Sequence, residues 1–104
     1  PTDEAFEALY ERLGVDGPAD IDNTTLTSVL TYHVIGARVF SSDLMDGITP
    51  ETLQGGTITI NLGDDVTISD VDSGSEDATV TDTDILGTNG VIHVIDQILI
   101  PVQL

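Results

Sequence analysis

The sequence has no cysteine, no tryptophan and no lysine, and its only basic residues are Arg12 and Arg38. Without cysteine, disulfides and cysteine-based zinc or thiol chemistry are excluded. Aromatic residues make up 4% of the chain, which argues against a deep apolar ligand pocket. No apolar run approaches the roughly 20 residues of a membrane span, and no signal-peptide pattern opens the chain. The 104 residues therefore suit one small domain that does not insert into a membrane.

Acidic residues dominate what remains. The chain carries 19 Asp and Glu residues and a net charge of −17, which would repel nucleic acid and anionic membranes. One interpretation is an ordinary acidic domain. The other is a protein of a halophilic prokaryote, because the Debye length shrinks to about 3 Å at 1 M salt and the carboxylates then repel one another little. The absence of lysine and the excess of Asp over Glu favour the second interpretation.

Hydrophobic periodicity predicts two helices in the first third of the chain. Residues 3–13 place their apolar side chains on one face, with Thr2 or Asp3 as the capping residue and Gly14 as the stop. A second helix is expected over residues 24–34, capped by Asn23.

After the second helix the apolar period changes to two, which predicts strands. Gly63-Asp64-Asp65 and Thr88-Asn89-Gly90 are typical hairpin turns between them. Two helices followed by strands without alternation indicate an α+β fold with an antiparallel sheet. The expected strands cover residues 37–40, 57–62, 66–69, 78–85, 91–95 and 98–102, with a short extended piece at 51–54.

Four segments, in order and spacing, resemble the conserved segments of the fasciclin (FAS1) domain family. They are Pro1–Phe6, Leu26–Val34, Thr52–Gly56 and Thr88–Asp96 followed by Leu99-Ile100-Pro101. The resemblance covers essentially the whole chain. It implies a FAS1-type antiparallel β-sandwich wedge with helices packed along one side, formed by residues 1–104 as a single domain that lacks the family's leading helices and first strand. A missing strand would expose backbone and favour self-association.

The resemblance also implies a non-enzymatic adhesion or interaction module that is secreted or displayed at the cell surface and uses no cofactor. Its partners would be proteins, homophilic or heterophilic, or extracellular matrix, bound by weak contacts whose strength comes from many copies. Animal members bind integrins through an Asp-Ile pair and a Tyr-His segment. Asp84 and Ile85 stand at the first of these places and Tyr32 and His33 at the second, so these four residues are the predicted partner contacts.

His33 and His93 each lie in an apolar stretch. They could be metal ligands beside so many carboxylates, but two isolated histidines without ligand spacing make a poor zinc site. The favoured interpretation is structural, with each imidazole making a buried hydrogen bond. No metal site is therefore predicted at the histidines.

An acidic loop offers a possible weak cation site formed by Asp70, Asp72, Glu76 and Asp77. The segment lacks the EF-hand spacing, because its glycine is Gly74, at the fifth position. A solvated connecting loop is the simpler interpretation. The alternative functions are accordingly a carbohydrate- or cation-binding extracellular module and a purely structural module of a larger surface protein.

Asn23-Thr24-Thr25 fits an N-glycosylation sequon, although Asn23 is equally a natural helix cap. No serine has a nucleophile-elbow context and no glycine-rich phosphate loop follows a strand, so no catalytic residues are predicted.

The charge pattern yields a salt prediction. We expect the melting temperature to rise by about 5 °C or more, roughly 1 kcal/mol for a chain of this size, between about 0.1 M and 2 M NaCl. Screening of repulsion between carboxylates is the physical reason. Thermal unfolding followed by circular dichroism measures it, and a melting temperature unchanged over this range would refute the salt-adapted interpretation.

Overall fold

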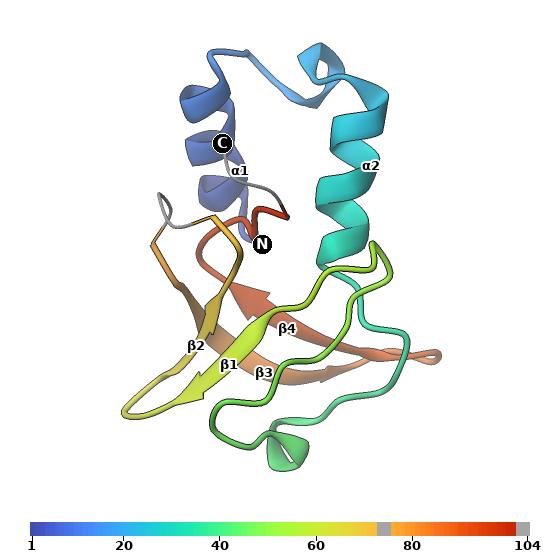
Figure 1. Cartoon of the computed structure of the whole chain (residues 1–104), viewed down its shortest axis with the longest axis vertical. Coiled ribbons are helices and arrows are strands. Elements are labelled where there is room, and N and C mark those ends of the chain that lie inside the picture. Colours follow the sequence, from blue (N-terminus) through green and yellow to red (C-terminus); the bar gives the residue numbers. More distant parts are fainter. Residues whose placement is uncertain (73–75, 102–104) are drawn as a thin grey trace.

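The computed structural model describes residues 1–72 and 76–101. Two α-helices precede four strands and stand together on one side of the sheet (Figure 1). This arrangement confirms the predicted α+β class. Among the described residues, no helix is both long and apolar enough to cross a membrane. The described elements are α1 (Asp3–Leu13), α2 (Asn23–Tyr32), β1 (Thr59–Leu62), β2 (Val66–Ser69), β3 (Ala78–Leu86) and β4 (Val91–Ile95), with short 3₁₀ helices at Pro18–Asp20 and Ser41–Asp43.

The four strands form one antiparallel sheet in which each strand pairs with its neighbours in sequence, in the order β1-β2-β3-β4. The sheet is bent, so that β1 and β2 cross in front of β3 and β4 (Figure 1). Ile60 lies opposite Ile68 in the first hairpin, and Ile85 lies opposite Ile92 in the last. The described strands belong to a single sheet, and the β-sandwich expected from the resemblance stays a prediction.

Both helices begin at a side-chain cap. The Thr2 hydroxyl accepts the Ala5 N–H at 3.2 Å, and Gly14 ends α1 with a φ of 70°, which favours glycine. In α2 the cap is Asp22, whose carboxylate accepts the N–H groups of Thr24 and Thr25 at 3.2 and 3.4 Å. The prediction that Asn23 caps α2 was wrong, because the helix begins one residue earlier than expected and Asn23 is its first residue.

Two predicted strands are not strands. Residues 37–40 and the described part of 98–102 pair with no strand, although apolar residues dominate both. Their backbone groups bond to side chains instead: the Val39 carbonyl and the Leu99 N–H each meet a histidine ring. The predicted extended piece at 51–54 is a turn after a single bridge at Glu51.

Apolar residues form two cores that share the C-terminal segment. One core lies inside the bent sheet and the other between the helices. Leu99 belongs to the first core, while its neighbours Ile98 and Ile100 belong to the second. The extended segment thus points alternate side chains into two interiors. The buried members are Tyr32, Ile58, Ile60, Ile68, Ala78, Ile95 and Leu99 for the sheet core, and Ala5, Leu9, Val29, Ile98 and Ile100 for the helical core.

One of the two basic residues compensates a buried acid. Arg12, in the last turn of α1, pairs with Asp72 at 2.5 Å, and the Asp72 side chain is 1% exposed. A buried carboxylate is costly unless it is paired with a cation, so Arg12 makes this burial possible. The pair ties α1 to the segment that follows β2.

We expect Arg12→Gln to destabilise the fold by about 2–4 kcal/mol, because it leaves the Asp72 carboxylate buried without its cation. Urea unfolding at high salt measures the change. Arg38→Gln is the matched control: it removes the same charge from an exposed side chain that lies over the Phe40 ring at 5.7 Å. The control should cost less than about 1 kcal/mol. Equal losses in the two variants would show that the ion pair contributes nothing specific.

Candidate functional site

Asp84 lies at an irregularity in β3. The register between β3 and β4 shifts between Val80 and Asp82 and again between Asp82 and Ile85. Asp84 has a φ of 59°, the left-handed region that Asp tolerates better than most residues. Its N–H turns towards β4 and donates to His93 Nδ1 at 3.2 Å. The irregularity therefore redirects Asp84 away from the regular ladder.

The Asp84 carboxylate binds Ser41 rather than pointing freely into solvent. One oxygen accepts the Ser41 N–H at 2.8 Å and the other accepts the Ser41 hydroxyl in a short hydrogen bond. The Ser41 hydroxyl is the main cause that lowers the pKa of the Asp84 carboxyl from its ordinary value, and the Ser41 N–H acts in the same direction. Asp84 is thus a negatively charged anchor for the segment that crosses beside β3.

His93 completes this anchor. Its Nε2–H donates to the Val39 carbonyl at 2.7 Å, while its Nδ1 accepts the Asp84 N–H. One donor and one acceptor are what a neutral imidazole offers. Together, Asp84 and His93 hold residues 39–41 against the last hairpin. The structural interpretation of His93 from the sequence agrees with this geometry.

Ile85, next to the anchor, is 43% exposed and lies directly across from Ile92, which is 58% exposed. Directly opposed residues in an antiparallel pair share a face of the sheet. Leu86 is also exposed, but it follows Ile85 in a regular stretch and lies on the other face. Two large apolar side chains thus stand together on the surface beside Asp84.

Tyr32, the last residue of α2, is fully buried in the sheet core. Its hydroxyl donates to the Thr57 carbonyl at 2.6 Å, just before β1. Burial is the main cause that raises the pKa of the Tyr32 phenol. Close to the ring, Gly56 leaves room that a side chain would fill, since a Cβ there would lie 3.2 Å from a ring carbon. The Tyr32 side chain therefore joins α2 to the sheet from inside.

His33 is the C-cap residue that follows α2, and it is only partly exposed. Its Nδ1–H donates to the Val29 carbonyl at 2.7 Å and its Nε2 accepts the Leu99 N–H at 2.8 Å. Both ring nitrogens are used, with the roles of Nδ1 and Nε2 reversed from those in His93. Burial is the main cause that lowers the pKa of His33, against the opposing effects of the Val29 carbonyl and Asp70. The partner-contact roles predicted for Tyr32 and His33 stay predictions, and in this structure both side chains bond internally.

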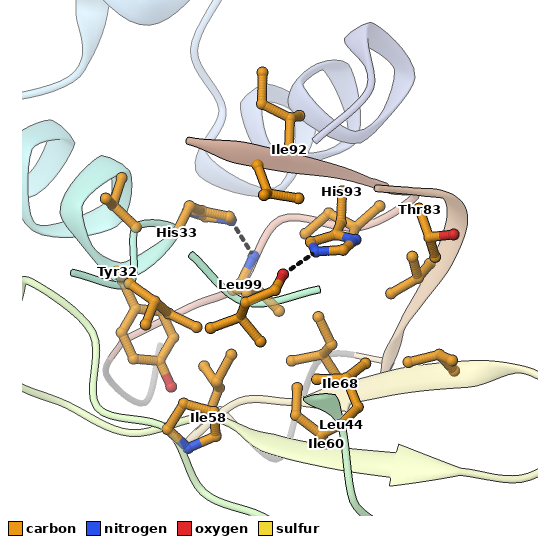
Figure 2. Close-up of a pocket in the computed structure, with 18 of the residues that line it drawn as sticks. Tyr32, His33, Leu44, Ile58, Ile60, Ile68, Thr83, Ile92, His93 and Leu99 are labelled. Carbon is orange, nitrogen blue, oxygen red and sulfur yellow. Dashed lines mark hydrogen bonds between the residues drawn. The ribbon is translucent and has the colours of Figure 1, made fainter. Parts of the chain in front are cut away.

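The two histidine rings face a cavity of about 410 Å³ that lies between the end of α2 and the bent sheet (Figure 2). Isoleucine, leucine and valine side chains from all four strands and their flanks supply most of its wall. No carboxylate of the described residues lines it, although the chain holds 19 acidic residues. Ile92 and Val34 line both this cavity and a shallower groove that passes Arg38 and the turn between β3 and β4.

The acidic loop is engaged within the protein. Asp70 accepts the N–H groups of Asp72 and Ile100 at 3.0 and 2.7 Å, and Asp72 pairs with Arg12. Residues 73–75 of this loop lie outside the described residues, while Glu76 and Asp77 are exposed. Over the ranges 1–72 and 76–101, no three potential metal-ligating side chains gather. The weak cation site at Asp70, Asp72, Glu76 and Asp77 stays a prediction.

The sequence identified several residues of the site, but it did not predict their hydrogen-bond and ion-pair partners. It singled out Asp84 but not Ser41 as the group that binds its carboxylate, and it did not pair Arg12 with Asp72. These contacts join residues far apart in the chain, so no local spacing indicates them. Ile92 lies in the strand predicted over residues 91–95, and only the sheet register places it beside Ile85.

Comparisons with protein families, curated proteins and solved structures all point to the same family. The model of the fasciclin domain family matches residues 1–101. Human periostin is 38% identical over 102 residues, which cover 97% of this chain and 11% of periostin. Protein sll1483 of Synechocystis is 32% identical over 102 residues, which cover 97% of this chain and 52% of that protein. The chain therefore spans only part of these relatives.

A solved structure shares the fold. It contains a FAS1 domain pair from the insect cell adhesion molecule fasciclin I and superimposes with a TM-score of 0.61 at 24% identity. The match covers 95% of this chain and 34% of that chain. At this identity the likeness concerns the arrangement of the backbone.

The buried imidazole of His33 generates a pH prediction. The unfolded chain takes up a proton near the ordinary histidine pKa of about 6.5, whereas folding lowers the pKa of His33. The unfolded state then binds more protons, so the free energy of unfolding should fall as the pH drops below about 6.5. Urea unfolding at high salt, between about pH 7.5 and 5.5, measures this decline above the range in which ordinary carboxylates titrate.

His33→Gln is the variant that tests this assignment. It should lose about 1–3 kcal/mol at pH 7.5, because the Leu99 N–H loses its acceptor. Its stability should also vary less with pH over the same window than that of the parent chain. If both proteins showed the same pH dependence, His33 would not be the responsible group.

Proposed function

This chain belongs to the fasciclin domain family, and from that premise we propose that it is a non-enzymatic adhesion or interaction module, secreted or held at the cell surface. The solved relative with the same fold comes from a cell adhesion molecule, which supports this function. The partner is a protein, and the first to consider is a second copy of the chain. Each contact is weak, and display in many copies supplies the strength of adhesion.

The observation that carries the proposal is an apolar strip formed by Val34, Ile85 and Ile92. These side chains are 45%, 43% and 58% exposed. Ile85 and Ile92 are direct cross-strand neighbours, and Val34 and Ile92 line the same groove. Exposed apolar side chains gathered in one place are typical of protein interaction sites, whereas single ones are not.

Charge favours the same place. The net charge of −17 opposes contact between two copies over most of the surface. Within residues 1–72 and 76–101, no carboxylate lines the groove beside the strip, and the charged residue that lines it is Arg38. A second acidic chain can approach there at the lowest electrostatic cost, and Arg38 can pair with one of its carboxylates.

Asp84 acts in this proposal as a positioning residue. Its bonds to Ser41 and His93 fix residues 39–41 and the bent part of β3, so that Ile85 is presented at the surface. Tyr32 and His33 support the strip from within, where they hold the end of α2 against β1 and the C-terminal segment. Ile85 is then the predicted contact, and the other three residues keep it in place.

The working environment is the second part of the proposal. A surface with this acid excess suits a salt-adapted prokaryote, because molar salt reduces the Debye length to a few ångströms. Two copies can then approach without long-range repulsion, and the apolar contacts at the strip decide whether they adhere.

The test is a bead assay with the purified chain. Beads that carry many copies should cluster at about 2 M NaCl and remain dispersed at about 0.1 M, since repulsion is screened only at the higher salt. Ile85→Ser should reduce clustering at 2 M about tenfold or more, because a central apolar contact contributes on the order of 1.4 kcal/mol or above. Light scattering follows cluster size.

Leu86→Ser is the matched control, since Leu86 neighbours Ile85 on the opposite face of β3 and is 66% exposed. It should cluster like the parent chain, and thermal unfolding confirms that both variants are folded. Equal clustering by Ile85→Ser and the parent would remove the strip as the contact. Beads that stay dispersed at both salts would exclude homophilic adhesion.

A further inference from the structure

We propose that Asn23 is an acceptor site for an N-linked glycan when the chain is exported. Asn23-Thr24-Thr25 has the spacing that oligosaccharyl transfer requires, with a hydroxyl residue two positions after the asparagine and no proline between them. This inference rests on the proposed extracellular location, because the transfer takes place along the export route.

In the structure, Asn23 is not the cap of α2, which was the alternative role for this residue. A helix cap at this position would hold the Asn23 side chain against the backbone, but the Asp22 carboxylate accepts the N–H groups of Thr24 and Thr25. Asn23, Thr24 and Thr25 are all exposed. Within the described ranges, no hydrogen bond engages the Asn23 carboxamide. The amide nitrogen is therefore available for modification without loss of the cap.

The other two asparagines provide an internal contrast. Asn61 and Asn89 are followed two positions later by Gly63 and Val91, neither of which has a hydroxyl group. Asn61 also donates through Nδ2 to the Ser69 hydroxyl at 2.9 Å. Neither asparagine meets the sequence requirement that Asn23 meets.

The backbone around Asn23 can open at small cost. The sequon forms the first turn of α2, where N–H groups have no partner within the helix. Unwinding this turn breaks the two hydrogen bonds to the Asp22 side chain and the backbone bond from the Leu26 N–H to the Asp22 carbonyl, and it leaves the last turns of α2 in place. An exposed loop, residues 14–22, precedes it and lacks long regular structure. A transferase can therefore reach this segment during or soon after folding.

The reaction joins Asn23 Nδ2 to the anomeric carbon of an oligosaccharide. The co-reactant is an oligosaccharide linked to a polyprenyl phosphate or pyrophosphate, and the host transferase supplies the catalytic groups. The new bond is nitrogen to carbon, the bond between that carbon and the phosphate oxygen breaks, and the phosphate leaves with the electron pair. One proton leaves Nδ2, so the product is a neutral glycosylamide.

The position suits an adhesion module. Asn23 begins α2 at the end that points away from the sheet, while Tyr32 ends it next to the sheet (Figure 1). Ten helical residues span about 15 Å, so a glycan on Asn23 would project from the helical end of the molecule. It would leave Ile85 and Ile92 uncovered.

The experiment is export of the full chain behind a cleavable signal peptide from a yeast secretory host. We expect the secreted protein to carry one glycan, removable by peptide N-glycosidase, with mass spectrometry locating the resulting Asn-to-Asp change at position 23 and at neither other asparagine. Asn23→Gln and Thr25→Ala should be secreted without the glycan, whereas Thr25→Ser and Thr24→Ala should retain it. The same chain made in the cytoplasm should be unmodified.

Secreted parent chain at its unmodified mass would overturn the proposal, and so would a glycan that persists in Asn23→Gln. Thermal unfolding of unglycosylated Asn23→Gln should match that of the unglycosylated parent, since the Asn23 side chain makes no bond in the fold. The bead assay uses unglycosylated chain, so its result is independent of this one. If Ile85→Ser did not reduce clustering, the proposed contact would be wrong. A glycan found at Asn23 would still support the glycosylation site.

Discussion

The fold depends on two imidazoles that each accept one hydrogen bond and donate another, so that each ring joins two segments at once. His33 joins the last turn of α2 to Leu99, and His93 joins the irregular part of β3 to Val39. Both rings face the same apolar cavity, and burial lowers the pKa of His33. Residues 37–40 and 98–100, which pair with no strand, are therefore fixed by hydrogen bonds to side chains.

This arrangement explains how far the sequence could predict the fold. The first helix and the two hairpins follow from local pattern, since the apolar period, the Thr2 cap and the hairpin turns act over a few residues. Residues 37–40 and 98–102 carry the same apolar signal as strands, but backbone groups of Val39, Leu99 and Ile100 bond to the side chains of His93, His33 and Asp70. Apolar pattern indicates that a segment is extended and buried; it does not indicate what satisfies the backbone.

For the candidate site, the sequence predicted which positions matter but not what surrounds each side chain. The resemblance pointed to Asp84, Ile85, Tyr32 and His33, and the structure gives these residues different surroundings. Ile85 is exposed beside Ile92, Asp84 binds Ser41, and Tyr32 is enclosed. A motif identifies positions, whereas exposure depends on contacts between distant segments. The groove beside the strip, which no carboxylate of the described residues lines, forms only when Val34 and the last hairpin are brought together in space.

The alternating C-terminal segment has a further consequence for how the chain assembles. Bonds within the β1–β2 hairpin join residues close in sequence, such as Asn61 and Ser69, which are 8 apart. The bond from Leu99 to His33 closes a loop of 66 residues, and that from Ile100 to Asp70 closes one of 30. Loop-closure entropy rises with length, so the hairpins form at lower cost than the docking of residues 98–100. Residues 98–100 contribute to both cores. The docking of this one segment, which has a high entropic cost, therefore completes the sheet core and the helical core together.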